Sequence, residues 1–349
     1  MYCPVRVFPV IAAAFLYLAG CSANTTTATR DGSMCVAARA VDEVAAPAPG
    51  GRAIDQPLDL SEAVRVPLQC QDGDSLSPPG PAQILSESEL GTINLHRPGR
   101  LLLVDVEIPT QGVFPFFLDT GARRTYVDKT LAQKLSGDGE AGRTIHIPEV
   151  RLGNLAIERL EAPIFDHGPL RRLTDNDAYG TVGFAHFRDL PMRISLAEST
   201  ITVGVDPAEI TGCTGCVGAV PFVVHRDLHL PMVEGTVDGH PVPLLIDTGA
   251  SGGIKIPEAI FDLLADESGR SLESNRFYWY TGESFTARRM ERPVELQLGT
   301  LEMSVHPTHE VPLEIGLLGL EFLQHFIITL DPAEGIAYFE VVQAPDCAW

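Results

Sequence analysis

The stretch that decides the fold is Phe116–Ala122 (FFLDTGA), because it returns as Leu244–Ala250 (LLIDTGA) 128 residues later. In each copy an apolar run ends in Asp-Thr-Gly-Ala. Such a run is typical of a β-strand, and the glycine permits a tight turn that leaves the aspartate at the strand tip. The motif therefore predicts two carboxyl groups, each presented at the end of a strand.

Two further blocks of sequence recur in the same order. Val150–Leu155 (VRLGNL) returns as Leu296–Leu301 (LQLGTL), and Gly180–Phe184 (GTVGF) returns as Gly316–Leu320 (GLLGL). Repetition of several blocks in one order is the signature of a repeated structural unit. The sequence therefore predicts two copies of one fold in a single chain.

The repeats and the flanking segments predict the organisation of the chain. Apolar runs punctuated by 32 glycines and 27 prolines favour a mainly all-β protein. Runs rich in Thr, Ala, Pro and Gly before the first repeat favour a flexible tether. The predicted parts are a signal peptide (1–20), a lipid-bearing cysteine and tether (21–94), a first lobe (95–208), a linker (209–218), a second lobe (219–343) and a tail (344–349).

The charge balance excludes one class of partner. The chain of 349 residues has 25 Lys and Arg against 46 Asp and Glu, a formal net charge of −21. A surface of this sign repels the phosphate backbone of nucleic acids and anionic lipid headgroups. We therefore expect no nucleic-acid partner, and contact with a membrane only through a covalent anchor.

The first residues predict export. The apolar run Val7–Leu18 is too short to span a bilayer and has the length of a signal-peptide core. It ends in Leu18–Cys21 (LAGC), which resembles the lipobox of bacterial lipoproteins. The resemblance implies acylation of Cys21 and a cell-envelope location, and Ser22 favours the periplasmic side of the outer membrane. The alternative is an ordinary secretory peptide with a chance cysteine.

Export also permits disulfides among the remaining cysteines. Cys213 and Cys216 have C-x-x-C spacing, and their Gly-rich surroundings favour a structural disulfide over a redox centre. The pairing remains open among Cys35, Cys70, Cys213, Cys216 and Cys347.

The two aspartates predict acid–base chemistry. In a two-copy molecule a pseudo-twofold axis can bring Asp119 and Asp247 together. Carboxylates about 3 Å apart repel by about 5 kcal/mol at an effective dielectric of 20, so the pair holds one shared proton. The ionised member can then deprotonate a water while the protonated member polarises a peptide carbonyl. The supporting loop positions are Thr120, Gly121, Ala122, Thr248, Gly249 and Ala250, of which the threonine hydroxyls can reach a neighbouring loop.

With these motifs the chain resembles the retropepsin-like aspartic proteases. The resemblance covers both D-T-G-A motifs and the blocks ending at Gly183 and Gly319, about 250 residues in all. It implies two closed-barrel lobes fused as a pepsin-like bilobal pseudo-dimer, with a cleft between them. It also implies an aspartic endopeptidase that acts on proteins or peptides as a monomer, without a cofactor or metal.

Some residues depart from the family pattern. Thr181 stands where a larger hydrophobic residue is usual, and Arg123 and Arg124 replace small polar residues after the first motif. Cations beside a carboxylate favour its ionised form, so the lobes are expected to be chemically unequal. The candidates for a flap over the cleft are Ser136–Arg143 and Phe277–Gly282.

Three competing interpretations are weighed against this one. Gly249–Gly253 matches the G-x-S-x-G elbow of serine hydrolases, but the following residues are a poor helix start. The pairs His225/His229 and His306/His309 have helical metal-ligand spacing but lie in strand-like stretches. The third alternative is a non-catalytic, peptide-binding envelope lipoprotein, which has no need of two paired carboxyls.

Overall fold

A computed structural model describes most of the chain from residue 79 onward. The described residues are 79–85, 90–96, 101–137, 142–174, 178–204, 210, 216–225, 229–268, 272–278, 284–290, 292–305, 308–311 and 314–342. They all fall within one compact unit of the chain. The predicted signal peptide, Cys21, Cys35, Cys70, Cys213 and Cys347 lie outside them.

The protein is mainly β, as the sequence predicts, and the N-terminal half (residues 90–204) contains a closed barrel of six strands. Two of the pairings, Leu118 with Val182 and Val127 with Ile164, are parallel, and the others are antiparallel. Neighbouring strands pair in the following order, and the last pairs with the first: β3 (Leu103–Ile108), β4 (Gly112–Asp119), β8 (Gly180–Gly183), β5 (Tyr126–Asp128), β7 (Leu155–Phe165) and β6 (Thr144–Leu152).

The C-terminal half (residues 216–341) repeats this pattern of pairing. Here, too, the strand that carries Asp-Thr-Gly pairs in parallel with the strand of the third repeated block. The equivalent strands are β12 (Pro231–Val237), β13 (His240–Ile246), β20 (Gly316–Leu318), β14 (Ile254–Pro257) and β19 (Thr308–Val311), with β17 (Val294–Leu298) pairing to β12 and β18 (Leu301–Val305) pairing to β17.

The repeated Leu-Gly block has the same structural role in both halves. Gly153 turns from β6 into β7 with φ +60°, and Gly299 turns from β17 into β18 with φ +57°. Each glycine also lies under a backbone carbonyl: a Cβ on Gly153 would be 2.1 Å from Thr92 O, and one on Gly299 2.3 Å from Ala219 O. Glycine is required at both turns because a side chain would be strained and would collide with the backbone.

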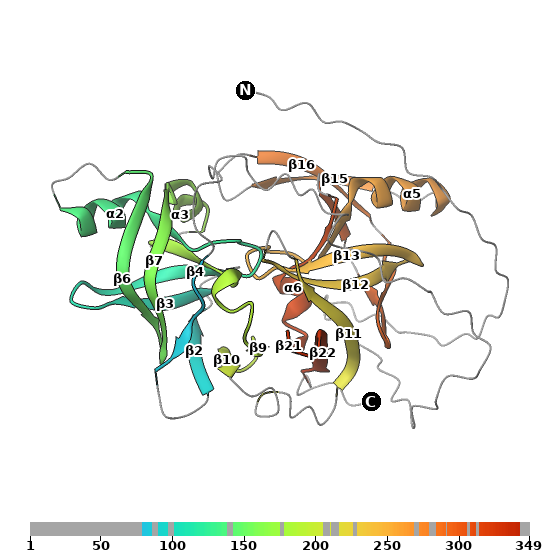
Figure 1. The fold of residues 1–349 in the computed structure, drawn as a ribbon. Helices are drawn as coiled ribbons and strands as arrows, with labels where there is room; N and C mark the ends of the chain where they lie inside the picture. Colours follow the sequence, from blue (N-terminus) through green and yellow to red (C-terminus); the bar gives the residue numbers. More distant parts are fainter. Residues whose placement is uncertain are drawn as a thin grey trace. The chain divides into compact units, whose positions relative to one another are not determined.

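One antiparallel sheet is shared by the two halves. Its central pairing joins β9 to β21, with Arg193 opposite Thr329 and Ile194 opposite Ile328. In Figure 1 these strands lie where the two halves meet. The order of the sheet is β2 (Leu90–His96), β10 (Thr200–Gly204), β9 (Met192–Ser195), β21 (Phe326–Asp331), β22 (Ile336–Val341) and β11 (Cys216–Val224).

The helices are short. Asp128 caps the first of them by accepting a hydrogen bond from the amide of Thr130 at 2.8 Å, as expected for an N-cap aspartate. The described helices are α2 (Lys129–Ser136), α3 (Gly168–Thr174), the 3₁₀ turn η1 (Phe184–His186), α5 (Glu258–Ser268) and α6 (Leu320–Leu323).

The ordered fold begins earlier than the sequence predicts. The tether is expected to reach residue 94, but β1 (Gln83–Ile84) pairs with β7, and β2 pairs with β10 and β3 from Leu90 onward. The prediction misplaced this boundary because β1 is too short to show alternation, and most of β2 pairs with β10, which is far away in the sequence.

The two flap candidates differ in the structure. Phe277 belongs to a hairpin of the C-terminal half formed by β15 (Leu272–Tyr278) and β16 (Ser284–Met290), whose connection lies outside the described residues. At the equivalent place in the N-terminal half, the described part of Ser136–Arg143 contains the end of α2 and no strand. The described residues therefore show a hairpin only at the second candidate.

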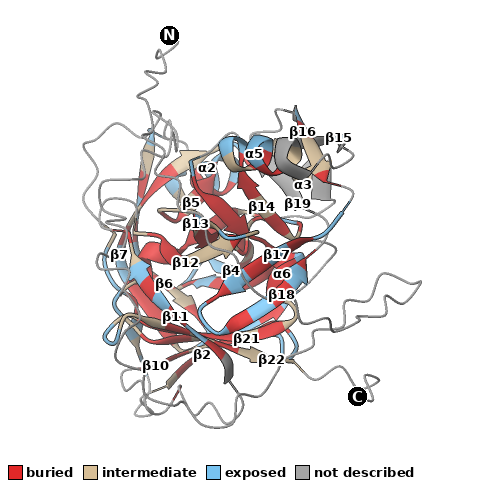
Figure 2. Cartoon of the chain, turned by 90° about the vertical axis from the view of Figure 1, so that its right-hand side faces the viewer, coloured by how far each residue is buried: buried red, intermediate tan, exposed pale blue. Residues whose placement is uncertain are grey.

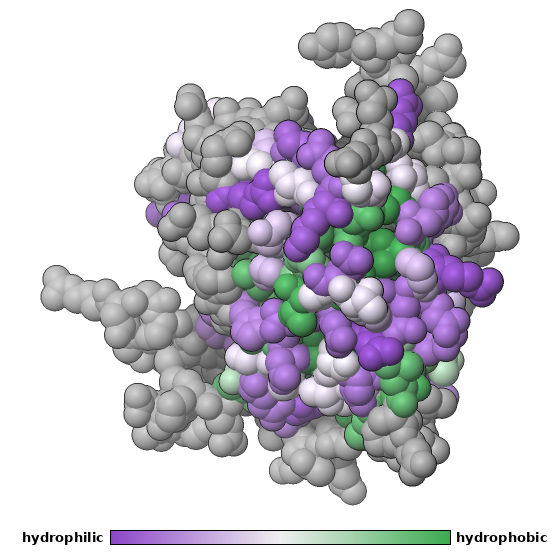
Figure 3. Space-filling model, turned by 90° about the vertical axis from the view of Figure 1, so that its left-hand side faces the viewer, coloured by the Kyte–Doolittle hydropathy of each residue, from purple (hydrophilic) through white to green (hydrophobic). Residues whose placement is uncertain are grey.

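Apolar side chains fill the interior of both halves. Figure 2 shows the buried residues along the strands and the exposed ones on helix faces and strand edges. The face formed by the N-terminal half is mainly hydrophilic, with small separated apolar areas (Figure 3). Among the described residues, no helix is long and apolar enough to span a membrane.

Candidate active site

Each Asp-Thr-Gly motif lies at the end of a strand that the barrel holds in register. β4 ends at Asp119, which is opposite Gly183 of β8. β13 ends at Ile246 opposite Leu318 of β20, and the amide of Asp247 then donates to the carbonyl of Leu318 at 3.0 Å. The Gly180 and Gly316 blocks thus flank the two motifs in the same way.

The two threonines tie the motifs together across the halves. The amide of Thr120 donates to Thr248 Oγ1 at 2.9 Å, and the amide of Thr248 donates to Thr120 Oγ1 at 3.0 Å. Each hydroxyl then donates to the opposite strand, Thr120 to Ile246 O at 2.6 Å and Thr248 to Leu118 O at 3.0 Å. Because both threonines are buried, every member of this network has its hydrogen-bonding partners inside the protein.

The glycines of the motifs lie against the opposite carboxyl groups. A Cβ on Gly121 would be 2.6 Å from Cγ of Asp247, and a Cβ on Gly249 would be 2.4 Å from Cγ of Asp119. Only glycine leaves room for the carboxyl groups to approach. The structure therefore brings Asp119 and Asp247, with their predicted supporting residues, into one site.

The two carboxyl groups are hydrogen-bonded to each other and have altered acidity. Burial and the charge of Asp247 raise the pKa of Asp119 well above its usual value. Burial also raises the pKa of Asp247, although the Lys255 ammonium and two backbone amides oppose this effect. A raised pKa on a paired carboxyl is what a group needs to hold a proton in the working range of an acid–base enzyme.

Backbone amides support both carboxyl groups, those of Gly121 and Ala122 at Asp119 and those of Gly249 and Ala250 at Asp247. Asp119 Oδ1 accepts a hydrogen bond from the amide of Gly121 at 2.8 Å. Asp247 Oδ1 accepts from two amides, those of Gly249 at 2.9 Å and Ala250 at 3.0 Å. Hydrogen bonds to a carboxylate stabilise its ionised form, so the backbone amides oppose the effect of burial at both aspartates.

From the sequence, Arg123 and Arg124 were expected to favour the ionised form of Asp119. In the structure, other groups have the main influence on the pKa of Asp119. Burial and Asp247 are the main influences on the pKa of Asp119, and both raise it. Arg124 is buried and helps to lower the pKa of His186 and of His229, and Arg123 also contributes to the effect on His229. Their charge therefore acts on these two histidines.

Thr181 departs from the expected hydrophobic residue because it joins a buried polar network. His167 Nε2 lies 3.0 Å from Thr181 Oγ1, and the amide of His167 donates to Asp128 Oδ2 at 2.9 Å. Arg171 Nη1 lies 3.2 Å from Asp128 Oδ1. Sequence analysis missed this network because its members are far apart in the chain and belong to no motif.

The structure argues against the nucleophile elbow and describes part of the candidate metal sites. Ser251 is followed by strand β14 rather than by the helix that a nucleophile elbow requires. His225 and His229 lie in a loop where the amide of His229 donates to the carbonyl of His225 at 2.7 Å. Within the described residues, no group of three or more His, Cys, Asp or Glu side chains could hold a metal ion, and the side chains of His306 and His309 lie outside them.

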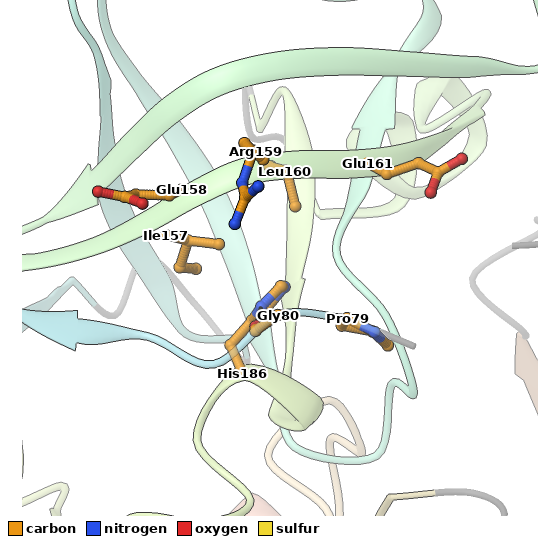
Figure 4. A pocket seen from close by; sticks show the side chains of 8 residues that line it. All are labelled: Pro79, Gly80, Ile157, Glu158, Arg159, Leu160, Glu161 and His186. Atoms are coloured by element: carbon orange, nitrogen blue, oxygen red, sulfur yellow. Dashed lines mark hydrogen bonds between the residues drawn. The ribbon is translucent and has the colours of Figure 1, made fainter. Parts of the chain in front are cut away.

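A small cavity of about 80 Å³ lies apart from the carboxyl pair, between β7 and residues 79–80. The side chains of Arg159 and His186 point into it, while Glu158 and Glu161 point away (Figure 4). His186 Nδ1 donates to the carbonyl of Gly80 at 2.7 Å, which leaves Nε2 as an acceptor. A cavity of this size with such a lining suits one or two water molecules.

Comparison with known proteins does not add to these observations. No protein-family model matches the sequence. A search of curated proteins finds no matching relative.

Proposed function

We propose that the protein is an aspartic endopeptidase of the retropepsin-like type, in which the two halves are lobes of a pepsin-like bilobal arrangement. The observation that carries this proposal is the pair of hydrogen-bonded carboxyl groups, one from each repeat, held by the threonine network. A binding site for peptides has no need of two half-buried carboxyl groups that repel each other.

The proposed reaction is hydrolysis of a peptide bond by a water held between the carboxyl groups. The ionised carboxyl takes a proton from the water, whose oxygen attacks the carbonyl carbon. The protonated carboxyl donates its proton to the carbonyl oxygen. Collapse of the tetrahedral intermediate breaks the C–N bond, and the amine leaves with a proton from the pair.

The supporting test is cleavage of a denatured protein mixture, with and without pepstatin. We expect Asp119→Asn and Asp247→Asn each to lower the rate by about 10²–10⁴-fold or more, because each removes one proton-transfer group. Glu158→Gln, an exposed carboxylate on β7, serves as the matched control. Binding of peptides without cleavage would instead favour the non-catalytic lipoprotein.

The location of the protein is a separate proposal. We infer from the lipobox-like sequence before Cys21 that the chain is anchored by lipid in a bacterial cell envelope, on the periplasmic side of the outer membrane. Replacing Cys21 with Ala should move the protein out of the membrane fraction and remove acyl labelling. Unchanged fractionation, with no label on the wild type, would contradict this proposal.

A further inference from the structure

Lys255 occupies a position in the C-terminal half that has a neutral counterpart in the N-terminal half. In β14, Lys255 is opposite Leu317, which is in turn opposite Leu245, two residues before Asp247. In the N-terminal half the same row of three strands is made by Tyr126, Thr181 and Phe117. Tyr126 is therefore the structural equivalent of Lys255.

The register directs Lys255 to the side of the sheet that carries Asp247. Residues opposite one another in adjacent strands point to the same face, as do residues two apart in one strand. Leu245 connects Lys255 to Asp247 by both rules. It lies in the same cross-strand row as Lys255, and it comes two residues before Asp247. The Cε atom of Lys255 lies only 3.6 Å from where a Cβ on Gly252 would be, so the side chain follows the loop that leaves the aspartate.

The loop that Lys255 follows is fixed to the start of α6. The amide of Leu320 donates to Ala250 O at 2.9 Å, and the amide of Glu321 donates to Gly252 O at 2.8 Å. Glu321 is exposed, whereas Lys255 is half-buried. In the N-terminal half, Ala185 follows Phe184 where Glu321 follows Leu320. The positions equivalent to Lys255 and Glu321 are therefore both uncharged in that half.

The charges around this lysine are few. Asp247 and Glu321 both act on Lys255 in the direction that favours its ammonium form, against the effect of burial. Asp247 in turn faces Asp119 and Lys255. Among the described residues packed beside them, β20 and the rest of α6 contribute only glycine and apolar side chains, Gly316–Leu318, Leu320, Phe322 and Leu323.

We propose that Lys255 is a positioning residue that fixes Asp247 as the ionised member of the carboxyl pair and leaves the proton on Asp119. Asp119 has no such cation at the equivalent position, which Tyr126 occupies. In the proposed hydrolysis Asp247 then accepts the proton of the water, and Asp119 donates to the carbonyl oxygen. This assignment of roles rests on the proposed function, while the unequal ionisation does not.

The test follows the ionisation of the two carboxyl groups directly, by carbon NMR of protein labelled at its aspartate carboxyls. Resonances are assigned by their loss in Asp119→Asn and in Asp247→Asn. In the wild type we expect Asp247 to ionise at lower pH than Asp119. Lys255→Met should move the titration of Asp247 upward by about one pH unit or more, because it removes an adjacent cation and keeps the length of the side chain.

Three further variants separate charge from structure. Lys255→Arg should restore the wild-type titration, and Tyr126→Phe at the equivalent position should leave it in place. Glu321→Gln should move the titration of Asp247 in the opposite direction, because Lys255 then loses its second anionic neighbour. A general loosening of the fold would not produce shifts of opposite sign.

The outcomes distinguish this inference from the proposed function. Earlier ionisation of Asp119, or an unchanged titration of Asp247 in Lys255→Met, would overturn the role of Lys255 even if the protein cleaves peptides. The expected titrations in a protein that cleaves no peptide would support the role of Lys255 and reject the endopeptidase. If the role of Lys255 and the endopeptidase activity are both correct, the acid limb of the pH profile of kcat/KM should move with the titration of Asp247.

Discussion

At the scale of single residues, the threonine network is the feature most sensitive to substitution. Thr120→Val keeps the shape of the side chain but leaves the amide of Thr248 and the carbonyl of Ile246 without their partner. A buried polar group without a partner costs about 1–3 kcal/mol. We expect Thr120→Val and Thr248→Val each to lower the free energy of unfolding by about 3 kcal/mol, measured by urea denaturation.

Thr120→Ser is the control for this prediction. It keeps the hydroxyl group and should cost less than about 1 kcal/mol, since it removes one methyl group. A loss below about 1 kcal/mol in Thr120→Val, or a larger loss in Thr120→Ser than in Thr120→Val, would show that the hydrogen bonds are not what stabilises the pairing of the halves.

The glycines of the motifs give a second prediction at this scale. Gly121→Ala would place a methyl group where the carboxyl of Asp247 lies, and Gly249→Ala would do so for Asp119. Either substitution should separate the carboxyl groups and abolish cleavage. Gly142→Ala is the matched control, because the nearest atom to its Cβ would be 3.8 Å away. Retained activity in Gly121→Ala would mean that the groups need not be in contact.

At the scale of elements, two buried histidines connect segments of the N-terminal half. His167 links the end of β7 to β8, and His186 links η1 to residue 80. Burial is the main reason that the pKa of each is lowered to about 4. Both are therefore neutral in the folded protein at neutral pH.

This burial predicts loss of stability in acid. The unfolded chain binds a proton at each histidine near pH 6.5, whereas the folded protein does so only near pH 4. The contribution of the neutral histidines to the free energy of unfolding is therefore fully present above about pH 6.5. It is lost as the pH falls toward 4, by about 3 kcal/mol for each histidine. Urea denaturation at several pH values should show this slope, and His167→Gln with His186→Asn should flatten it. A slope unchanged in the double variant would contradict the prediction.

The elements also show what the sequence could predict. The sequence could predict three repeated features: the strands bearing Asp-Thr-Gly, the Leu-Gly blocks and the third repeated block. Each of them combines a local sequence pattern with a glycine that the backbone requires. The threonine hydroxyls were expected to reach a neighbouring loop, and the structure shows that this loop belongs to the other repeat. Strand β1 was missed because two residues carry no periodicity.

Lys255 and the Asp128–His167 network were not predictable from the sequence. Their significance comes from which strands are neighbours in the sheets: Lys255 is placed beside Asp247 only through the row that crosses β20. His167 is placed beside Thr181 only because β7 and β8 both pair with β5. A linear motif does not contain this information.

At the scale of the whole molecule, both carboxyl groups belong to one chain. The hydrogen bonds between Thr120 and Thr248 are contacts within that chain, so the site needs no second copy. We expect the specific activity to stay constant on dilution over several orders of magnitude. Mixing inactive Asp119→Asn with inactive Asp247→Asn should restore no activity. Recovery on mixing would instead indicate that the site forms between chains.

The sheet shared by the halves has a consequence for when such a site can form. Asp119 and its barrel are synthesised well before Asp247, and β21, which pairs with β9, comes later still. A nascent chain that has produced only the first motif has one carboxyl group and no partner for it. On the proposed function, a growing chain is therefore unable to digest itself or its neighbours, and the order of synthesis delays proteolysis until β21 and β22 have joined the sheet.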